Sequence, residues 1–339
     1  MVYDKEGFYR TAMEVAQSAG DQSGKTFLIT GAYSGIGVET TKALLAQNAQ
    51  VILAGRNAEA MKTFVSELTV KQPEEGEEES EENNNNALID ADGPLCDLND
   101  LRSVLGFAKY VLQKYTKLDV LILNAGVMMT PPGVTAQKLE TQIGINCVGH
   151  FLLAQKLLPI TSRQVWLSSS AHSAAGAKRF EFSWFQNFDV EDEYEVSCYD
   201  PMFAYQQSKL GTILLAKEFA KRCSGEGEDK EAKVEAVSLH PGVINTNLGR
   251  HLPGYLKLTF SAMSWVGLMS RKTVEQGAAT TVTCATLSSE ELKNGAYYDD
   301  CQVGKESGNA TNTEDAIRLY DLCLQLTQDV EEEIEEKDV

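Results

Sequence analysis

Short apolar runs alternate with segments of helical periodicity along most of the chain. Continuous apolar runs predict strands at KTFLIT (25–30), QVILAG (50–55), LDVLILNAG (118–126), RQVWLSSS (163–170) and KVEAVSLHPG (233–242). A helix is predicted over 36–47, and another over 101–115, where apolar residues recur at every third or fourth position. Strands that are apolar on both faces are typical of a parallel sheet with helices on both sides. The pattern therefore predicts a single α/β domain with a Rossmann-type, doubly wound parallel sheet.

Composition and charge indicate the limits of the domain and the partners that the chain should not bind. The chain has 339 residues, is 43% hydrophobic and carries a formal net charge of −19, so it can bury a large core and should repel nucleic acids. Much of the acid lies in QPEEGEEESEENNNN and in the last ten residues, and such runs are usually solvated. We expect an N-terminal extension (1–22), a Rossmann domain (23–328) with an acidic insert (72–88), and an acidic tail (329–339).

The cysteines and the chain start bear on the compartment. Seven scattered cysteines, an odd number, fit reduced thiols better than a disulfide framework. The four histidines do not cluster with cysteines, so no metal site is expected. The chain has no run of about twenty apolar residues, and it begins MVYDKEGFYR, with charges where a secretory signal would be apolar. We expect a soluble cytoplasmic protein without a membrane span, with a plastid or other organelle surface as the alternative.

A glycine-rich turn, TGAYSGIG (30–37), joins the first predicted strand to the first predicted helix. Glycines at this place allow a tight turn and let the backbone approach a pyrophosphate. Glycine-rich turns are common, so the turn alone is a weak signal. The predicted strand before the turn and the predicted helix after it strengthen the assignment. We predict nucleotide contacts from the turn residues Gly31, Tyr33, Ser34, Gly35, Ile36 and Gly37.

The second predicted strand ends in LAGRN (53–57). NAD-binding sheets usually place an acidic residue here, which binds the adenosine ribose and repels a 2′-phosphate. This chain has Gly55 at that place, followed by Arg56 and Asn57. A guanidinium can bind a 2′-phosphate as a charge-assisted pair, although a solvated loop arginine is the simpler alternative. The combination favours NADP(H).

In FAYQQSKL (203–210), Tyr205 and Lys209 are four positions apart and would share one face of a helix. A nearby ammonium favours the phenolate, so we expect Lys209 to lower the pKa of Tyr205 and make it an acid and base at cellular pH. With twelve tyrosines in the chain, the spacing alone decides nothing.

Together these motifs form a resemblance. The phrases TGAYSGIG, CDL (96–98), LNAG (123–126), NCVGHF (146–151), LSSSAH (167–172), YQQSK (205–209) and HPGVINT (240–246) follow the order seen in short-chain dehydrogenases/reductases. TAMEVAQ, VILAGRN, EQGAATTVTCA and NGAYYDDC make the chain similar to retinol dehydrogenases and to the dehydrogenase domain of WW-domain oxidoreductases, without the WW modules. The resemblance covers about residues 10–328, apart from the acidic insert.

The resemblance implies site residues by position. The implied catalytic set is Asn146, Ser169, Tyr205 and Lys209. Cofactor contacts are implied for Asp97, Leu98, Asn124, Ala125, Gly126, Tyr205, Lys209, Pro241, Gly242, Val243 and Thr246. Ser168 and Ser170 flank the assigned serine, so a shift of one residue stays open. For His150 and His172, core packing or loop hydrogen bonding is favoured over catalysis.

The implied activity is the interconversion of a carbonyl and an alcohol (EC 1.1.1.-), with Ser169 donating a hydrogen bond to the substrate oxygen and Tyr205 moving the proton. The segment 250–272, rich in aromatic residues and methionine, is predicted to be a substrate lid, with a core helix or a weak membrane-surface contact as alternatives. The expected substrate is small and lipophilic: a retinoid, carotenoid, steroid or long-chain aldehyde.

Two other functions and an assembly state belong to the same expectation. Plant relatives associated with plastid import suggest an NADP(H)-binding redox sensor or scaffold, and a protochlorophyllide-reductase-like enzyme is the other alternative. A homodimer would form through the helices that hold Asn146 and Tyr205.

Overall fold

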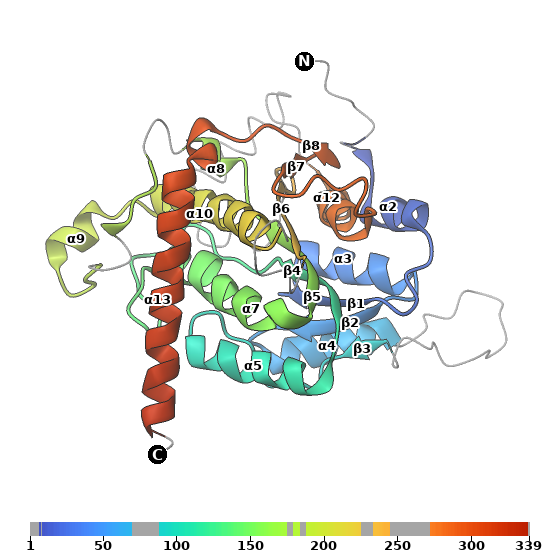
Figure 1. Cartoon of the computed structure of the whole chain (residues 1–339), viewed down its shortest axis with the longest axis horizontal. Helices are drawn as coiled ribbons and strands as arrows, with labels where there is room; N and C mark the ends of the chain where they lie inside the picture. Colours follow the sequence, from blue (N-terminus) through green and yellow to red (C-terminus); the bar gives the residue numbers. More distant parts are fainter. Residues whose placement is uncertain are drawn as a thin grey trace.

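The computed structural model describes residues 7, 9–69, 88–174, 179–183, 188–224, 233–244 and 272–337. At its centre lies a sheet of eight strands in the order β3-β2-β1-β4-β5-β6-β7-β8 (Figure 1). The strands are β1 (Thr26–Thr30), β2 (Gln50–Ala54), β3 (Ile89–Asp90), β4 (Leu118–Leu123), β5 (Thr161–Leu167), β6 (Glu235–His240), β7 (Tyr297–Asp299) and β8 (Gln302–Val303). Only the β7–β8 pair among these strands is antiparallel. The strand order reverses between β1 and β4, and doubly wound sheets bind ligands at this point. The predicted fold class is confirmed.

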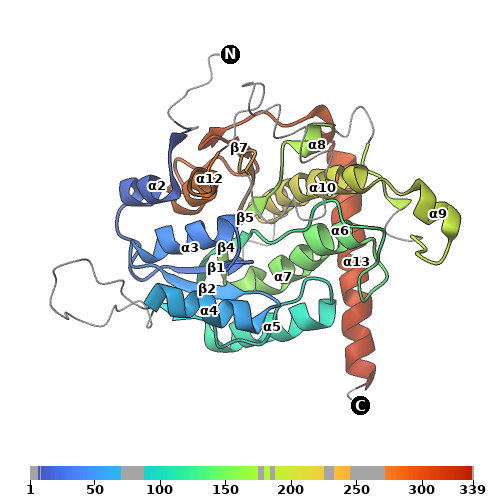
Figure 2. The same ribbon diagram turned by 180° about the vertical axis from the view of Figure 1, so that it is seen from behind.

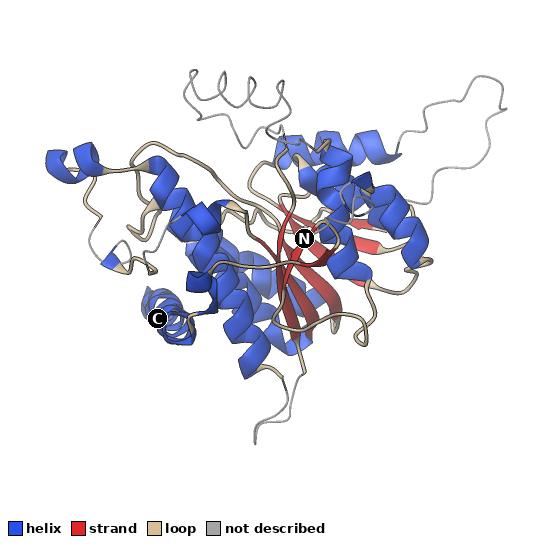
Figure 3. Ribbon diagram, turned by 90° about the horizontal axis from the view of Figure 1, so that it is seen from above, coloured by secondary structure: helices blue, strands red, loops and turns tan. Residues whose placement is uncertain are grey.

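Helices cover both faces of the sheet (Figures 2 and 3). One face carries α3 (Ile36–Leu45), α4 (Ala58–Thr69) and α12 (Val274–Thr286), with α2 (Ala12–Ala19) packed on α3 and α12. The other face carries α5 (Leu101–Lys114), α7 (His150–Leu157) and α10 (Pro201–Arg222), and α13 (Thr313–Lys337) packs outside them. Shorter segments are α6 (Thr141–Ile143), a π-helix (Gly144–Gly149), α8 (Ala171–Ala174), α9 (Glu193–Cys198) and two 3-10 turns (Leu158–Ile160 and Gly308–Thr311).

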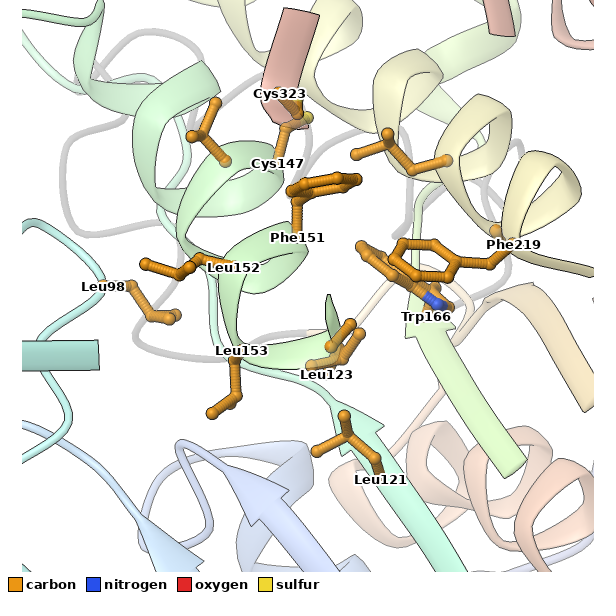
Figure 4. Packing of buried hydrophobic residues seen from close by; sticks show 14 of the residues in the cluster. Leu98, Leu121, Leu123, Cys147, Phe151, Leu152, Leu153, Trp166, Phe219 and Cys323 are labelled. Carbon is orange, nitrogen blue, oxygen red and sulfur yellow. The ribbon is translucent and has the colours of Figure 1, made fainter. Parts of the chain in front are cut away.

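Alternate residues of each strand belong to different cores, as the pleat of a sheet requires. In β1, Leu28 contributes to the core under α5, α7 and α10, whereas Phe27 and Ile29 contribute to the core under α3, α4 and α12. Figure 4 shows the first core, in which the ring of Phe219 lies 5.6 Å from Trp166 and 5.5 Å from Phe151. Each fully buried phenylalanine of this kind contributes about 1.5–3 kcal/mol.

The helix α13 is fixed to α7 and α10 by one tyrosine and its neighbours. The Tyr320 ring lies 4.9 Å from Phe151 and 5.0 Å from Phe219, and its hydroxyl donates to Gln155 Oε1 at 2.9 Å. Arg222 of α10 covers the same ring at 4.0 Å. The outer side of α7 and α10 is therefore covered by a helix of the same chain.

One helical stretch among the described residues, Thr141–Ile160, is long and apolar enough to cross a membrane by composition, with a mean hydropathy of 1.3. The core helix of a globular domain has the same composition, and 72% of the apolar window is buried inside the protein. Packing against α5 and α10 accounts for its apolar character.

Candidate active site

The glycine turn after β1 has the backbone geometry that the sequence predicts. Gly31 and Gly35 have φ angles of 67° and 53°, which residues with a Cβ rarely adopt. A Cβ on Gly37 would overlap the carbonyl oxygen of Gly31 and lie 2.9 Å from the side-chain nitrogen (Nδ2) of Asn124. The turn and the start of α3 are therefore packed too closely for any larger residue at position 37. Ser34 is exposed and Ile36 is half-buried at the first position of α3.

The end of β2 carries the cation that was predicted to favour NADP(H). Arg56 is exposed, and its Nη1 lies 4.0 Å from Asp97 Oδ1; an exposed pair at this distance contributes little to stability. The backbone N–H groups of Arg56 and Asn57 both donate to the hydroxyl of Tyr33, at 3.2 and 3.1 Å. Leu98, by contrast, is buried in the core and packs against Gly149.

The loop after β4 connects the glycine turn to the candidate catalytic groups. Thr30 Oγ1 accepts hydrogen bonds from the backbone N–H groups of Asn124 and Ala125, both at 2.9 Å. A Cβ on Gly126 would lie 3.2 Å from Asn146 Oδ1 and 3.5 Å from Lys209 Nζ. This predicted cofactor loop therefore lies directly against two members of the predicted catalytic set.

Asn146 lies in the π-helix, a rare irregularity that is frequent at functional sites. Its side chain is buried and fully hydrogen-bonded: Oδ1 accepts from Val127 N, and Nδ2 donates to Val127 O and Ser208 Oγ, each at 2.9 Å. The side-chain amide thus holds the loop after β4 against α10. With these bonds in place, the side chain positions the loop after β4 relative to α10.

The structure distinguishes the three serines after β5. The hydroxyl of Ser168 is buried and donates to the carbonyl of Lys209 at 2.7 Å, whereas Ser170 is exposed. Ser169 is half-buried, its hydroxyl accepts from Ala171 N at 3.2 Å, and its side chain lowers the pKa of Tyr205. Of the three, Ser169 is the serine that lies next to the phenol, and this geometry favours the original assignment.

Tyr205 and Lys209 lie on α10, which begins where the sequence provides a cap. Asp200 accepts hydrogen bonds from the backbone N–H groups of Met202 and Phe203, and Pro201 occupies the first helical position. Lys209 Nζ lies 5.8 Å from the centre of the Tyr205 ring and donates to the carbonyl of Leu167 at 2.9 Å. The tyrosine and lysine side chains therefore share one face of the helix, at the end of β5.

Burial governs the protonation of both groups. It raises the pKa of Tyr205 to about 12, against a smaller lowering by the hydrogen bond with Ser169. It lowers the pKa of Lys209 to about 8, because the ammonium loses its hydration. The expectation that Lys209 makes Tyr205 more acidic is wrong for this state of the protein, since desolvation exceeds any effect of the ammonium. The phenol is protonated at neutral pH.

Two histidines hold loops of the site through hydrogen bonds whose partners the sequence did not reveal. His150 Nδ1 lies 3.2 Å from the carbonyl oxygen of Asn146, and Nε2 lies 3.0 Å from Thr30 Oγ1. A carbonyl only accepts, so Nδ1 carries the proton and Nε2 accepts from the Thr30 hydroxyl. Burial lowers the pKa of His150 to about 3, which keeps this neutral form. His150 thus links the candidate catalytic helix to the end of β1.

His172 supports Ser169 in a similar way. Its Nδ1 donates to the carbonyl of Ser169 at 2.6 Å, and its Nε2 accepts from Ser307 N at 3.1 Å. Burial lowers the pKa of His172, which favours the neutral ring that these two bonds need. Both histidines form loop and core hydrogen bonds, in line with the interpretation of the sequence.

The loop after β6 is described only as far as Ile244. Gly242 has a φ of 93°, with the Lys272 side chain packed against it, and Val243 is exposed. The Lys272 ammonium forms an ion pair with Asp300 at 2.5 Å. Thr246 and nearly all of the predicted lid (250–272) lie outside the described residues, as does the acidic insert (72–88) except for its last residue. Within the described ranges, no group of three or more His, Cys, Asp or Glu side chains could hold a metal ion.

Comparison with known proteins places the chain in a family. The family model for short chain dehydrogenases matches residues 25–169. Human retinol dehydrogenase 11 is 35% identical over 308 residues, covering 89% of this chain and 86% of the relative. The short-chain dehydrogenase TIC 32 A, chloroplastic, from Brassica napus is 33% identical over 334 residues, covering 95% and 94%. The chain belongs to the short-chain dehydrogenase/reductase family, and within it to the retinol dehydrogenase-like group.

Solved structures agree with this fold. An uncharacterised protein from Mycobacterium paratuberculosis superimposes with a TM-score of 0.67 at 27% identity, covering 92% of this chain and 97% of that one. A short-chain dehydrogenase from Burkholderia cenocepacia in complex with NADP has a TM-score of 0.58 at 17% identity, covering 86% and 99%.

Proposed function

We propose that this protein is an NADP(H)-dependent oxidoreductase that reduces a carbonyl on a lipophilic substrate to an alcohol, with Tyr205 as the proton donor. The observation that carries the proposal is the placement of Tyr205 and Lys209 at the carboxyl end of β5, with Lys209 Nζ 5.8 Å from the centre of the Tyr205 ring and donating to the carbonyl of Leu167, two residues before Ser169. These are the groups that the reaction needs in one place: a donor for the oxygen on which charge develops, an acid, and a cation.

The residues at the sheet edge fit a nicotinamide dinucleotide. The turn at Gly31 and Gly35, both at positive φ, has the backbone geometry of a pyrophosphate-binding turn, and the absence of a carboxylate at Gly55 together with the cation of Arg56 suits a 2′-phosphate. The solved NADP complex of the Burkholderia relative supports the same cofactor. When bound, NADPH supplies the hydride.

The chain's own residues would handle the substrate oxygen. Ser169 would donate a hydrogen bond to it, and Tyr205 would then transfer its proton. A phenol with a pKa near 12 is fully protonated at neutral pH, which is the state that reduction requires and oxidation does not. Lys209 would keep a positive charge near the phenol as it loses its proton, because an ammonium with a pKa of about 8 is still mostly charged at pH 7.

The lipophilic substrate class rests on the names of the relatives, several of which are retinol dehydrogenases. All-trans-retinal and long-chain aldehydes are therefore the first substrates to test. Small polar aldehydes should turn over more slowly, and the opposite order would argue against an apolar pocket.

The decisive experiment compares Tyr205→Phe with the wild type for NADPH binding, by fluorescence titration, and for single-turnover reduction of retinal. We expect unchanged binding and a 10²- to 10⁴-fold slower reaction, the usual contribution of a general acid. Tyr194→Phe, at an exposed position on α9, is the matched control. Unchanged turnover in Tyr205→Phe would refute the assignment. NADPH binding by the wild type without turnover of any carbonyl would favour an NADP(H)-binding sensor or scaffold.

A further inference from the structure

Tyr33 occupies the place at the end of β2 where the cofactor's adenosine ribose would lie. A Cβ on Gly55 would overlap the edge of the Tyr33 ring, so the tyrosine rests directly on the backbone of that glycine. The rest of the half-buried ring packs against the core under α3 and α4. Gly55 therefore leaves the space that Tyr33 fills, in addition to lacking a carboxylate.

The hydroxyl of Tyr33 accepts hydrogen bonds from two backbone N–H groups at the end of β2. It accepts from Arg56 N at 3.2 Å and from Asn57 N at 3.1 Å, and the side chain of Arg56 is itself exposed. Two backbone N–H groups and a guanidinium are well suited to an anionic oxygen. The Tyr33 hydroxyl satisfies the two N–H groups without adding a negative charge beside the guanidinium, whose carboxylate partner, Asp97, lies 4.0 Å away.

We propose that Tyr33 is a specificity-determining residue for the adenosine end of the cofactor, because its hydroxyl holds the two N–H groups that a 2′-phosphate would take. This inference rests on the proposed NADP(H) dependence. Binding of a 2′-phosphate then requires the hydroxyl to leave, whereas a nucleotide without that phosphate leaves the Tyr33 hydrogen bonds intact. Tyr33 thus reduces the difference in binding affinity by which Arg56 favours NADP(H) over NAD(H).

The test uses two small probes that differ only in the 2′-phosphate, 2′,5′-ADP and 5′-AMP, with binding measured by calorimetry. Tyr33→Phe keeps the ring and removes the hydroxyl. Since an intramolecular hydrogen bond contributes about 1 kcal/mol net, we expect the variant to bind 2′,5′-ADP about fivefold more tightly and 5′-AMP as the wild type does. Tyr194→Phe should change neither affinity, and melting curves of both variants establish that they are folded.

The possible outcomes separate the two proposals. Equal changes for both probes, or weaker 2′,5′-ADP binding by Tyr33→Phe, would overturn the role given to Tyr33; weaker binding would mean that the hydroxyl itself donates to the phosphate. Arg56→Ala tests the proposed cofactor independently, because it should weaken 2′,5′-ADP binding and leave 5′-AMP binding unchanged. If the wild type does not prefer 2′,5′-ADP and Arg56→Ala has no effect, the NADP(H) dependence fails, and the inference about Tyr33 fails with it.

Discussion

Replacing Lys209 with methionine should make the protein more stable and less active. The side chain is 5% exposed, and burial lowers its pKa from 10.5 to about 8. This difference corresponds to about 3 kcal/mol of destabilisation when the ammonium is charged. Methionine has a similar length and no charge, but it loses the hydrogen bond to the carbonyl of Leu167, which costs about 1 kcal/mol. At pH 7 we therefore expect Lys209→Met to be about 2 kcal/mol more stable to unfolding and inactive.

The sign of this effect should depend on pH. Between about pH 8 and 10.5 the folded wild type has released the Lys209 proton and the unfolded chain still binds it, so the stability of the wild type rises with pH in this window. The advantage of Lys209→Met is full below pH 8, and above pH 10.5 it becomes a disadvantage of about 1 kcal/mol, because only the lost hydrogen bond remains.

Urea denaturation of both proteins at pH 7 and pH 10 measures this effect directly. Lys221→Met, at an exposed lysine in the last turn of the same helix, controls for removing a lysine from α10. The reasoning would be refuted if Lys209→Met were less stable than the wild type at pH 7, or if its advantage were the same at both pH values.

Two other predictions concern the packing of the glycine turn and a buried ion pair. Gly37→Ala should weaken NADPH binding at least tenfold, because its Cβ would overlap the carbonyl of Gly31; Gly106→Ala, on α5 with nothing within 4 Å, should bind normally and gain about 0.5–1 kcal/mol. Equal binding by both variants, measured by fluorescence titration, would contradict this. Arg163→Met should cost about 3–5 kcal/mol in urea denaturation, because it leaves the carboxylate of Glu235 buried without its 2.7 Å partner. Adding Glu235→Leu should restore most of that loss, and a double variant as unstable as the single one would argue against this reason.

The apolar pattern predicted the strands and helices that form the centre of the fold. The predicted strand at 25–30 is β1 (Thr26–Thr30), and the predicted helix at 101–115 is α5 (Leu101–Lys114). Other predicted strands were too long at their ends, because the small and polar residues after them begin the loops of the site. The short strands β3, β7 and β8 were not predicted, since two or three residues cannot show a periodicity.

The site was predicted by residue type and position, but its contacts were not. Motif order placed Ser169 near Tyr205, yet three consecutive serines cannot be distinguished without knowing which hydroxyl is buried. The Arg56 partner of Tyr33 and the Thr30 partner of His150 are 23 and 120 residues away, so no local pattern contains them. The π-helix around Asn146 was missed for a different reason, because a shift of the backbone hydrogen bonds leaves no mark in the order of apolar residues.

The packing of α13 on α7 and α10 limits how two copies of this chain can associate. The predicted homodimer uses α7 and α10, but α13 already lies on them through Tyr320, with a further ion pair of 2.8 Å between Arg222 and Asp321. A second subunit could reach that face only after this helix had detached and exposed the rings of Phe151 and Phe219. Self-association through that face and retention of α13 are alternatives, so we expect sedimentation to show the 339-residue chain as a monomer.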